Sequence, residues 1–326
     1  MNFKNNMFFL ATIWIINPGL AGLGYATPVK IRICKIADHP ALDATTQGIT
    51  ETLRKNGYQD IKIESAQGSP ALAGQIASRL NSEARGGQHK LISVAIGTIA
   101  AQSLAKYARK KAFPLIFSSI TDPQGAGLTK YPSGCILKGV SNFVPIEPQL
   151  KKFQSIQPTL KRLTLIYNPG ESNSVFLLKE VQRACTKMGM VLTKKTLMKT
   201  SDAMQVVKQV APSTDAFFIT NDNTALSALP AIVKAAGDIP VYISDTDALK
   251  PSGAVAAFGP DQYDLGVQTA HMVLSLLTEK KGSPTDPLIE LPKKTEFVIN
   301  HASALKKKGI VLLAPSAPYT AIKLKK

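Results

Sequence analysis

Small polar side chains collect where short apolar segments of this chain end, and their chemical types suit the capture of a charged small molecule. Most of them are hydroxyl, amide or carboxylate groups, which bind a ligand through hydrogen bonds and charge. The candidate ligand-binding residues are His39, Pro40, Thr98, Gln102, Ser119, Thr121, Asp122, Asn168, Glu171, Asn173, Ser174, Asp222, Asn223, Thr224, Asp245, Thr246 and Tyr263.

The types of these side chains match the two ends of an amino acid. Thr98 stands where a helix should begin, and the backbone N–H groups at a helix start attract anions such as a carboxylate. Ser119 and Thr121 add hydroxyl groups after another apolar segment. Asp222 or Asp245 would supply the negative charge that an ammonium group requires. Together they suit a zwitterion, although each such residue alone also fits the role of a helix N-cap.

The sequence carries no residue set for making or breaking covalent bonds. It has no G-x-S-x-G elbow, no Walker loop and no G-x-G-x-x-G after its first apolar segment. Its four histidines do not pair at a metal-binding spacing. We therefore expect a binding protein that is not an enzyme and that uses no cofactor and no metal.

Seven apolar segments, each followed by a polar cluster and a helix-like pattern, must position these side chains. The segments are KIRICKIA, LISVAIG, FPLIFSS, RLTLIY, DAFFIT, IPVYIS and AVAAFG. This order predicts strands alternating with helices, and hence an α/β fold with doubly wound parallel sheets. Open parallel sheets bind ligands outside the carboxyl ends of their strands, which is where the polar clusters fall.

The alternating pattern occurs in two series of similar size, which predicts two lobes. One series runs from residue 27 to about 140, the other starts near 161, and the joint falls near 139–148. The helices are expected at 41–56, 70–80, 99–111, 172–188, 202–210, 225–237 and 263–278. The tail beyond 284 contains one strand candidate, at 296–299.

The first 26 residues have the layout of a secretory signal peptide. Lys4 gives a positive start, 7–16 is almost wholly apolar, and Gly24-Tyr25-Ala26 offers a cleavage site after Ala26. A disordered start or a retained anchor is the alternative. The run is shorter than the roughly 20 apolar residues that span a bilayer. We expect a protein released into the periplasm of a Gram-negative cell.

Charge and cysteine content restrict the partners. The net charge of +17 is dispersed in short lysine and arginine runs without interleaved aromatic residues, so we expect a solvated basic surface and no nucleic acid. Cys34, Cys135 and Cys185 fit no metal or redox spacing. Buried free thiols are expected, and a Cys135–Cys185 bridge is left open.

At this point the motifs resemble one family, the ABC-transporter substrate-binding proteins that include tryptophan- and tyrosine-binding members. The similar stretches, in chain order, include DHPALDATTQGI, AIGTIAAQSLA, IFSSITDPQGAGL, IYNPGESNSV, ITNDNTALSAL and ISDTDALKPSGAVAAFGPDQYDLGVQTA. They cover almost all of the chain after residue 26. The sequence departs from the family at Asn142, where an acidic residue is common, and near Lys35, where a glutamine is common.

The resemblance implies the type I periplasmic binding fold, in which two doubly wound lobes joined by a hinge close on a ligand. It implies an N-terminal lobe of 27–141 plus 251–282 and a C-terminal lobe of 142–250 plus 283–326. The implied function is delivery of an aromatic amino acid to an inner-membrane ABC permease by a monomer. Asn168, Glu171 and Asn173 would then lie at the rim, and Tyr263 or Pro40 would form an apolar slot.

Other ligands and roles fit the same fold. NDNTALSA and DTDA also resemble sugar-binding relatives, so a sugar or purine ligand is an alternative. A second alternative is a sensor that presents its ligand to a membrane receptor. A repressor-like regulator would need a DNA-binding helix pair at the N-terminus, where the signal peptide stands.

Overall fold

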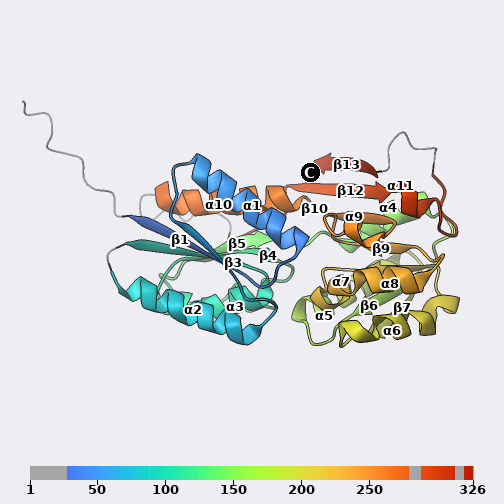
Figure 1. The fold of residues 1–326 in the computed structure, drawn as a ribbon, viewed down its shortest axis with the longest axis horizontal. Coiled ribbons are helices and arrows are strands. Elements are labelled where there is room, and N and C mark those ends of the chain that lie inside the picture. Colours follow the sequence, from blue (N-terminus) through green and yellow to red (C-terminus); the bar gives the residue numbers. More distant parts are fainter. Residues whose placement is uncertain (1–27, 88, 279–287, 313–318, 326) are drawn as a thin grey trace, which may run out of the picture.

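The computed structural model describes residues 28–87, 89–278, 288–312 and 319–325, so the expected signal peptide lies outside the described residues. Two α/β lobes lie side by side, each built around one sheet (Figure 1). This arrangement confirms the predicted fold class.

The first sheet has the strand order β11-β5-β4-β3-β1-β2 and its pairs are parallel. Helices α1 and α10 cover one face, and α2 and α3 cover the other (Figure 1). The elements are β1 (Val29–Lys35), α1 (Pro40–Lys55), β2 (Ile61–Ser65), α2 (Pro70–Arg85), β3 (Lys90–Ile96), α3 (Thr98–Ala108), β4 (Leu115–Ile120), β5 (Leu137–Ser141), α10 (Gln262–Thr278) and β11 (Ile289–Glu290).

The second sheet has the order β13-β12-β10-β9-β8-β6-β7, and only the pairs formed by β12 are antiparallel. Helices α4 and α5 pack on one face, and α6 and α8 pack on the other. The elements are α4 (Ile146–Ile156), β6 (Arg162–Tyr167), α5 (Ser172–Lys187), β7 (Val191–Thr196), α6 (Ala203–Val210), β8 (Ala216–Ile219), α7 (Asn223–Ser227), α8 (Leu229–Ala236), β9 (Val241–Ile243), α9 (Leu249–Ser252), β10 (Ala256–Pro260), β12 (Lys294–Asn300), α11 (His301–Ala304) and β13 (Tyr319–Lys325).

The helix starts follow from capping residues in the sequence. The side chains of His39 and Ser69 accept hydrogen bonds from the first turns of α1 and α2, and a proline follows each cap. The single helix expected at 225–237 is instead two helices, α7 and α8, that meet at Ala228. Pro230 lacks an N–H group, so it fits the first turn of a new helix better than the interior of a long one.

Helix α10 is fixed to the first lobe by a close approach to α1. A Cβ atom on Gly48 would lie 2.2 Å from the carbonyl oxygen of Tyr263, and one on Gly266 would lie 2.1 Å from that of Thr45. Only glycine leaves room for the two backbones to meet at these points. The packing therefore explains why α10 returns to the first lobe although the preceding strand belongs to the second.

The lobe boundaries differ from those expected in two places. The segment 251–282 was assigned to the first lobe, but β10 pairs with β9 and β12 in the second sheet. The tail 283–326 was assigned to the second lobe, but β11 pairs with β5 in the first sheet. The reason is that main-chain pairing, which the apolar pattern does not encode, decides the sheet of a short strand. The chain crosses between lobes after β5, after β10 and after β11.

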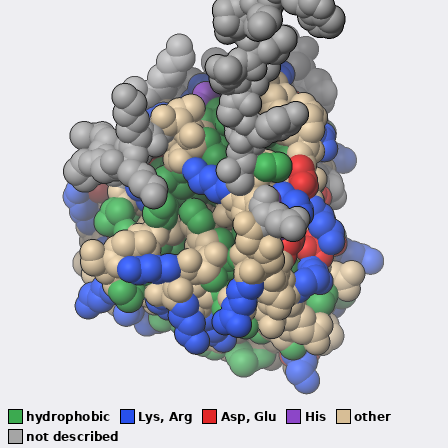
Figure 2. Space-filling view, turned by 90° about the vertical axis from the view of Figure 1, so that its left-hand side faces the viewer, with side chains coloured by type: hydrophobic (Ala, Val, Ile, Leu, Met, Phe, Trp, Pro, Cys, Tyr) green, Lys and Arg blue, Asp and Glu red, His purple; other side chains and the backbone are tan. Residues whose placement is uncertain are grey.

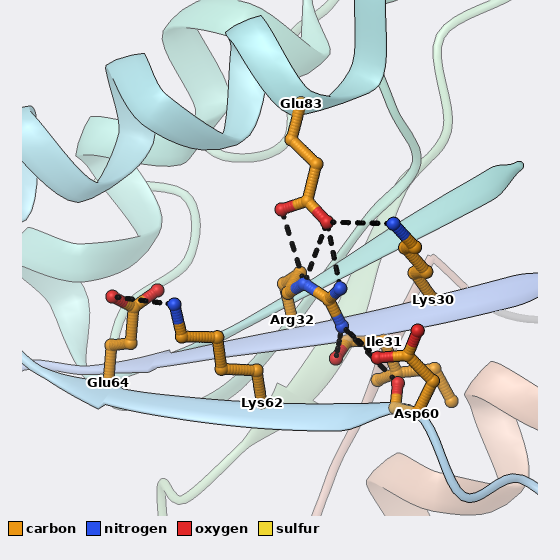
Figure 3. Close-up of polar contacts among 7 residues, drawn as sticks. All are labelled: Lys30, Ile31, Arg32, Asp60, Lys62, Glu64 and Glu83. Carbon is orange, nitrogen blue, oxygen red and sulfur yellow. Dashed lines mark hydrogen bonds and ion pairs between the residues drawn. The ribbon is translucent and has the colours of Figure 1, made fainter. Parts of the chain in front are cut away.

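A buried arginine ties helix α2 to the first sheet. Arg32 on β1 donates two hydrogen bonds from Nε and Nη2 to Glu83 Oε1, at 3.1 and 2.7 Å, and one from Nη1 to Asp60 Oδ1 at 2.7 Å (Figure 3). Burial alone would raise the pKa of Glu83, but the hydrogen bonds and charge of Arg32 outweigh it and lower that pKa. The cluster is structural, because none of its members lines the cavity described below.

Lysine and arginine side chains are spread over the outer end of the first lobe among apolar and neutral groups (Figure 2). Cys34 and Cys185 are buried free thiols, as expected, whereas Cys135 is a free thiol that is only half-buried. Burial raises the pKa of Cys34 to about 12 and that of Cys185 to about 11, so both sulfurs stay protonated near neutral pH. Within the described residues, no helix combines the length and apolar character that crossing a membrane requires.

Candidate ligand site between the lobes

A cavity of about 50 Å³ lies between the two lobes, beyond the carboxyl ends of their strands. It is lined from the first lobe and the adjoining crossover by Ile36, His39, Ala41, Leu42, Gly97, Thr98, Ser119, Thr121, Asn142 and Gln262. It is lined from the second lobe by Asn173, Asn221, Asn223, Leu226 and Asp245. Most of these side chains are polar, so a ligand here meets hydrogen-bonding groups from both sides.

One wall of the cavity is the start of α3. Gly97 has φ +92° and precedes Thr98 without any side-chain cap, and the first helical bond runs from Ala101 N to Gly97 O. The backbone N–H groups before that bond, together with the helix dipole, favour an anion. This wall therefore suits a carboxylate.

Ser119 reaches the cavity because β4 contains a bulge. The register of β4 against β5 shifts between Ser118 and Ile120, and Ser119 has φ +57°. A left-handed backbone is unfavourable for a residue with a Cβ atom, and such strain concentrates at binding sites. The Ser119 Oγ lies 3.4 Å from Thr45 Oγ1, which donates to Gln262 Oε1 at 3.2 Å. The bulge thus turns a hydroxyl toward the space where a ligand would lie.

The opposite wall is held rigid by hydrogen bonds within the second lobe. Asn173 Nδ2 donates to the carbonyl oxygen of Asn221 at 2.7 Å. Both oxygens of Glu171 accept hydrogen bonds from Asn223 and Thr224, including their backbone N–H groups. These contacts join the start of α5 to the start of α7, so that the asparagines are preorganised.

The carboxylates of Asp222 and Asp245 differ in how many of their oxygens accept hydrogen bonds from the backbone. Asp222 Oδ1 accepts from Ala225 N and its Oδ2 from Asn168 N, and its carboxylate does not line the cavity. Asp245 Oδ1 accepts from the backbone of Asp247 and Ala248, whereas its Oδ2 lies 3.8 Å from Nδ1 of His39, and both residues line the cavity. Asp245 is only 2% exposed, and this burial raises its pKa. Asp245 therefore has the oxygen that can receive a cation.

The structure brings together seven of the candidate residues expected from the sequence. These are His39, Thr98, Ser119, Thr121, Asn173, Asn223 and Asp245. Gln102 and Glu171 line an adjoining outer pocket of about 260 Å³, which shares Ile36, Thr98, Asn173 and Asn223 with the cavity. The two pockets therefore adjoin each other.

Other candidate residues support the site from outside its lining, or lie elsewhere. Asn168 donates hydrogen bonds to Asp222 and Thr224 behind the wall of the second lobe, from its backbone N–H and its Nδ2 respectively. Asp122 Oδ1 accepts from Gly125 N in a turn of the first lobe. Pro40, Ser174 and Thr246 do not line the cavity or the outer pocket.

The expectation that Tyr263 lines the cavity is wrong. Tyr263 is 37% exposed and donates from its hydroxyl to Glu51 Oε2 on α1 at 2.7 Å. The contact of its carbonyl with Gly48 fixes the rotation of α10, and that rotation turns the neighbouring Gln262 into the cavity. Adjacent residues of a helix point about 100° apart, so both cannot face the ligand.

Sequence reasoning missed part of the lining. The missed residues are Ile36, Ala41, Leu42, Gly97, Asn142, Asn221, Leu226 and Gln262. All of them except Asn142 lie within four sequence positions of Tyr263 or of a candidate residue that lines the cavity. Nearness in the sequence to a candidate residue was therefore the available signal. Asn142 holds the Thr121 hydroxyl at 3.0 Å through its Oδ1. Lys35, the other family departure, pairs with Asp38 and Asp43 and does not line the cavity.

Comparison with known proteins identifies the family. The model of the ABC transporter substrate binding proteins matches residues 30–314. This chain belongs to that family. A tyrosine-binding protein of Clostridioides difficile (strain R20291) is 29% identical over 281 residues, which are 83% of this chain and 78% of that protein.

Solved structures of two similar proteins show the same fold as this chain. A conserved domain protein from Vibrio cholerae O1 biovar El Tor strain N16961 has a TM-score of 0.76 at 32% identity, covering 88% of this chain and 96% of that one. An ABC domain from Streptococcus pneumoniae in complex with L-Trp has a TM-score of 0.75 at 28% identity, covering 86% and 96%. The type I periplasmic binding fold is thereby confirmed.

Proposed function

We propose that this substrate-binding protein captures a free amino acid with an aromatic side chain and delivers it to an ABC permease. One observation supports this above others: an anion-favouring helix start and a buried carboxylate oxygen face the same cavity from different lobes. A zwitterion contacts both only when the lobes are close together.

The two ends of the ligand have distinct partners in this proposal. Its carboxylate contacts the start of α3 at Thr98 and the hydroxyls of Ser119 and Thr121. Its ammonium group contacts Asp245 Oδ2, since the Asp222 oxygens are occupied by backbone N–H groups. Charge-assisted hydrogen bonds of this kind are about twice as strong as neutral ones, so they fix the orientation of the ligand.

The side chain of the ligand extends from the cavity along its apolar part. Ile36, Leu42 and Leu226 line the cavity from both lobes and offer aliphatic contacts to a flat ring. The tyrosine-binding relative and the L-Trp complex support an aromatic ligand for this chain. The outer pocket beside Gln102 gives room for the far edge of the ring.

Binding proceeds by closure of the lobes in this proposal. The ligand enters while the lobes are apart and gains the contacts of the second lobe only on closing, so the closed state is favoured by its higher affinity. The permease then distinguishes the closed state from the open one. Release of a monomer into the periplasm after cleavage at Ala26 accounts for the layout of the first 26 residues.

A ligand test separates the candidates. The only tryptophan is Trp14, so a chain cleaved after Ala26 contains none and added L-tryptophan reports its own burial by fluorescence. We expect the melting temperature of the secreted protein to rise with millimolar tryptophan, tyrosine or phenylalanine, because saturating ligand stabilises the native state. Failure of all three to raise it would reject the aromatic assignment.

A sugar is the second candidate, because four asparagine side chains line the cavity and amides suit hydroxyl groups. They are Asn142, Asn173, Asn221 and Asn223. The same melting experiment with ribose, galactose and adenosine tests this candidate. Stabilisation by a neutral polyol that matches or exceeds that by the amino acids would favour it.

A further inference from the structure

His39 and Asp245 face each other across the cavity from different lobes. His39 caps α1 in the first lobe, and Asp245 follows β9 in the second. His39 Nδ1 lies 3.8 Å from Asp245 Oδ2, which is the carboxylate oxygen that accepts no backbone bond. The pair is therefore an interlobe contact at the point that the ligand ammonium group would occupy.

One nitrogen of His39 faces two groups that require opposite protonation states. Nδ1 accepts a hydrogen bond from Ala41 N at 3.3 Å, which needs its lone pair. A favourable contact with Asp245 Oδ2 needs a proton on the same atom. Protonation therefore exchanges the N-cap bond of α1 for an ion pair between the lobes.

We propose that His39 competes with the ligand ammonium group for Asp245, so that protonation of His39 selectively weakens the binding of ligands that carry an ammonium group. This inference rests on the proposed function, because it assigns a control of affinity to the same site. Histidine is the side chain that gains its charge between about pH 5 and 8, so acidification would promote ligand release.

Other charged groups near His39 and Asp245 could also affect the binding of a cation at this pair. On the side of His39, Asp38 and Asp43 are paired with Lys35. The helix starts of α1 and α3 are partial positive charges that disfavour a second cation, and Gln262 is neutral. The ion pairs of Lys35, Asp38 and Asp43 in the described residues do not include Asp245.

On the side of Asp245, the neighbouring carboxyl of Asp247 titrates near neutral pH. Burial, then the charges of Asp245, Asp261 and Glu296, raise the pKa of Asp247 to about 7, while Lys250 opposes them. Asp222 and Glu171 are hydrogen-bonded within the second lobe. An experiment on His39 must therefore include a variant of Asp247.

The decisive measurement compares two ligands across pH. Calorimetry gives the Kd of L-tryptophan and of indole-3-propionate, which lacks the ammonium group, at about pH 5, 6 and 7. Over this range tryptophan keeps both of its charges, whereas the carboxyl of the analogue, with a pKa near the value of about 4.3 for a glutamate side chain, is protonated to a minor extent at pH 5. For the wild type we expect the Kd of tryptophan to rise at least about threefold from pH 7 to 5, and that of the analogue to change less.

The matched variant is His39→Asn, because asparagine also accepts the N-cap bond but does not titrate. We expect His39→Asn to flatten the pH dependence for tryptophan, and Asp247→Asn to preserve it. If the Kd of tryptophan depends on pH as steeply in His39→Asn as in the wild type, or loses its pH dependence in Asp247→Asn, the effect belongs to another group and the proposal is overturned. Tryptophan binding without pH dependence would reject this inference alone, whereas absence of binding by every amino acid at each pH would reject the proposed function as well.

Discussion

The guanidinium of Arg32 forms two hydrogen bonds with one oxygen of Glu83, at 3.1 and 2.7 Å, and the arginine is only 6% exposed. Arg32 lies on β1 and Glu83 near the end of α2, so the pair joins the sheet to the helix layer that also carries the site helix α3 (Figure 3). A buried charge that loses its partner is costly, which makes this pair a sensitive point of the first lobe.

Arg32→Ala should lower the free energy of unfolding by about 1 to 3 kcal/mol, because Glu83 loses its hydrogen bonds to the guanidinium and keeps only Lys30, at 3.7 Å, as a cationic partner. Urea unfolding at neutral pH measures the change. Arg79→Ala is the control: Arg79 also pairs with a glutamate, Glu64, but is 51% exposed, so its loss should cost at most about 1 kcal/mol. Equal effects of the two variants would contradict the structural role of Arg32.

Glu83 should also make stability depend on pH. Its pKa is lower in the folded state than in the unfolded chain, so its ionised form stabilises the fold above an unfolded pKa of about 4.3. That contribution is lost as the pH falls through the folded pKa. The stability difference between wild type and Glu83→Gln should therefore shrink below about pH 4.3. A difference that stays constant down to the lowest pH at which the protein folds would contradict this.

Ser119→Gly should separate stability from binding. Glycine removes the cost of φ +57°, so the variant should be more stable by up to about 1 kcal/mol, while ligand affinity falls because a cavity hydroxyl is lost. Ser118→Gly is the contrast, since its side chain holds Thr269 at 2.7 Å and its backbone has no positive φ. It should destabilise the protein. Thermal melting and calorimetry measure both effects.

Asp245→Asn tests the ammonium partner. The variant keeps an oxygen for the backbone of Asp247 and Ala248 but loses its charge, so the Kd of an amino acid should rise at least about tenfold. The Kd of a deaminated analogue should change less. If Asp222→Asn, at a carboxylate that caps α7 outside the cavity, weakens amino-acid binding more than Asp245→Asn does, the ammonium assignment is wrong.

The layers of the fold could be predicted because apolar segments of strand length alternate with capped helical segments. Helix α4 was not expected, since Pro148 interrupts its pattern; the proline lies in the first turn, where no N–H group is needed. The sheet of β11 depended on its pairing with β5, far along the chain, and that of β10 on whether the strand stayed beside β9 or crossed to the first lobe with α10. Local sequence does not contain that information.

The sequence predicted which segments of the chain form the candidate site, but it did not predict which side chain of each segment lines the cavity. His39, Thr98 and Asp245, which were expected from strand ends, line one cavity, because the carboxyl ends of parallel strands share one edge. Whether Gln262 or Tyr263 lined the cavity depended on the rotation of α10, which is set by its contact with α1. A rotation of that kind is a property of packing and not of a helical pattern.

Gly48→Ala tests that packing. The added methyl group would lie 2.2 Å from the backbone oxygen of Tyr263, so α1 and α10 must separate and the free energy of unfolding should fall by about 1 to 3 kcal/mol or more. Gly74→Ala is the matched control, since Gly74 lies within α2 and nothing stands within 4 Å of its added Cβ. That change should stabilise the protein by about 0.5 to 1 kcal/mol. Because α10 carries Gln262 into the cavity, Gly48→Ala should also weaken ligand binding, whereas Gly74→Ala should leave it unchanged.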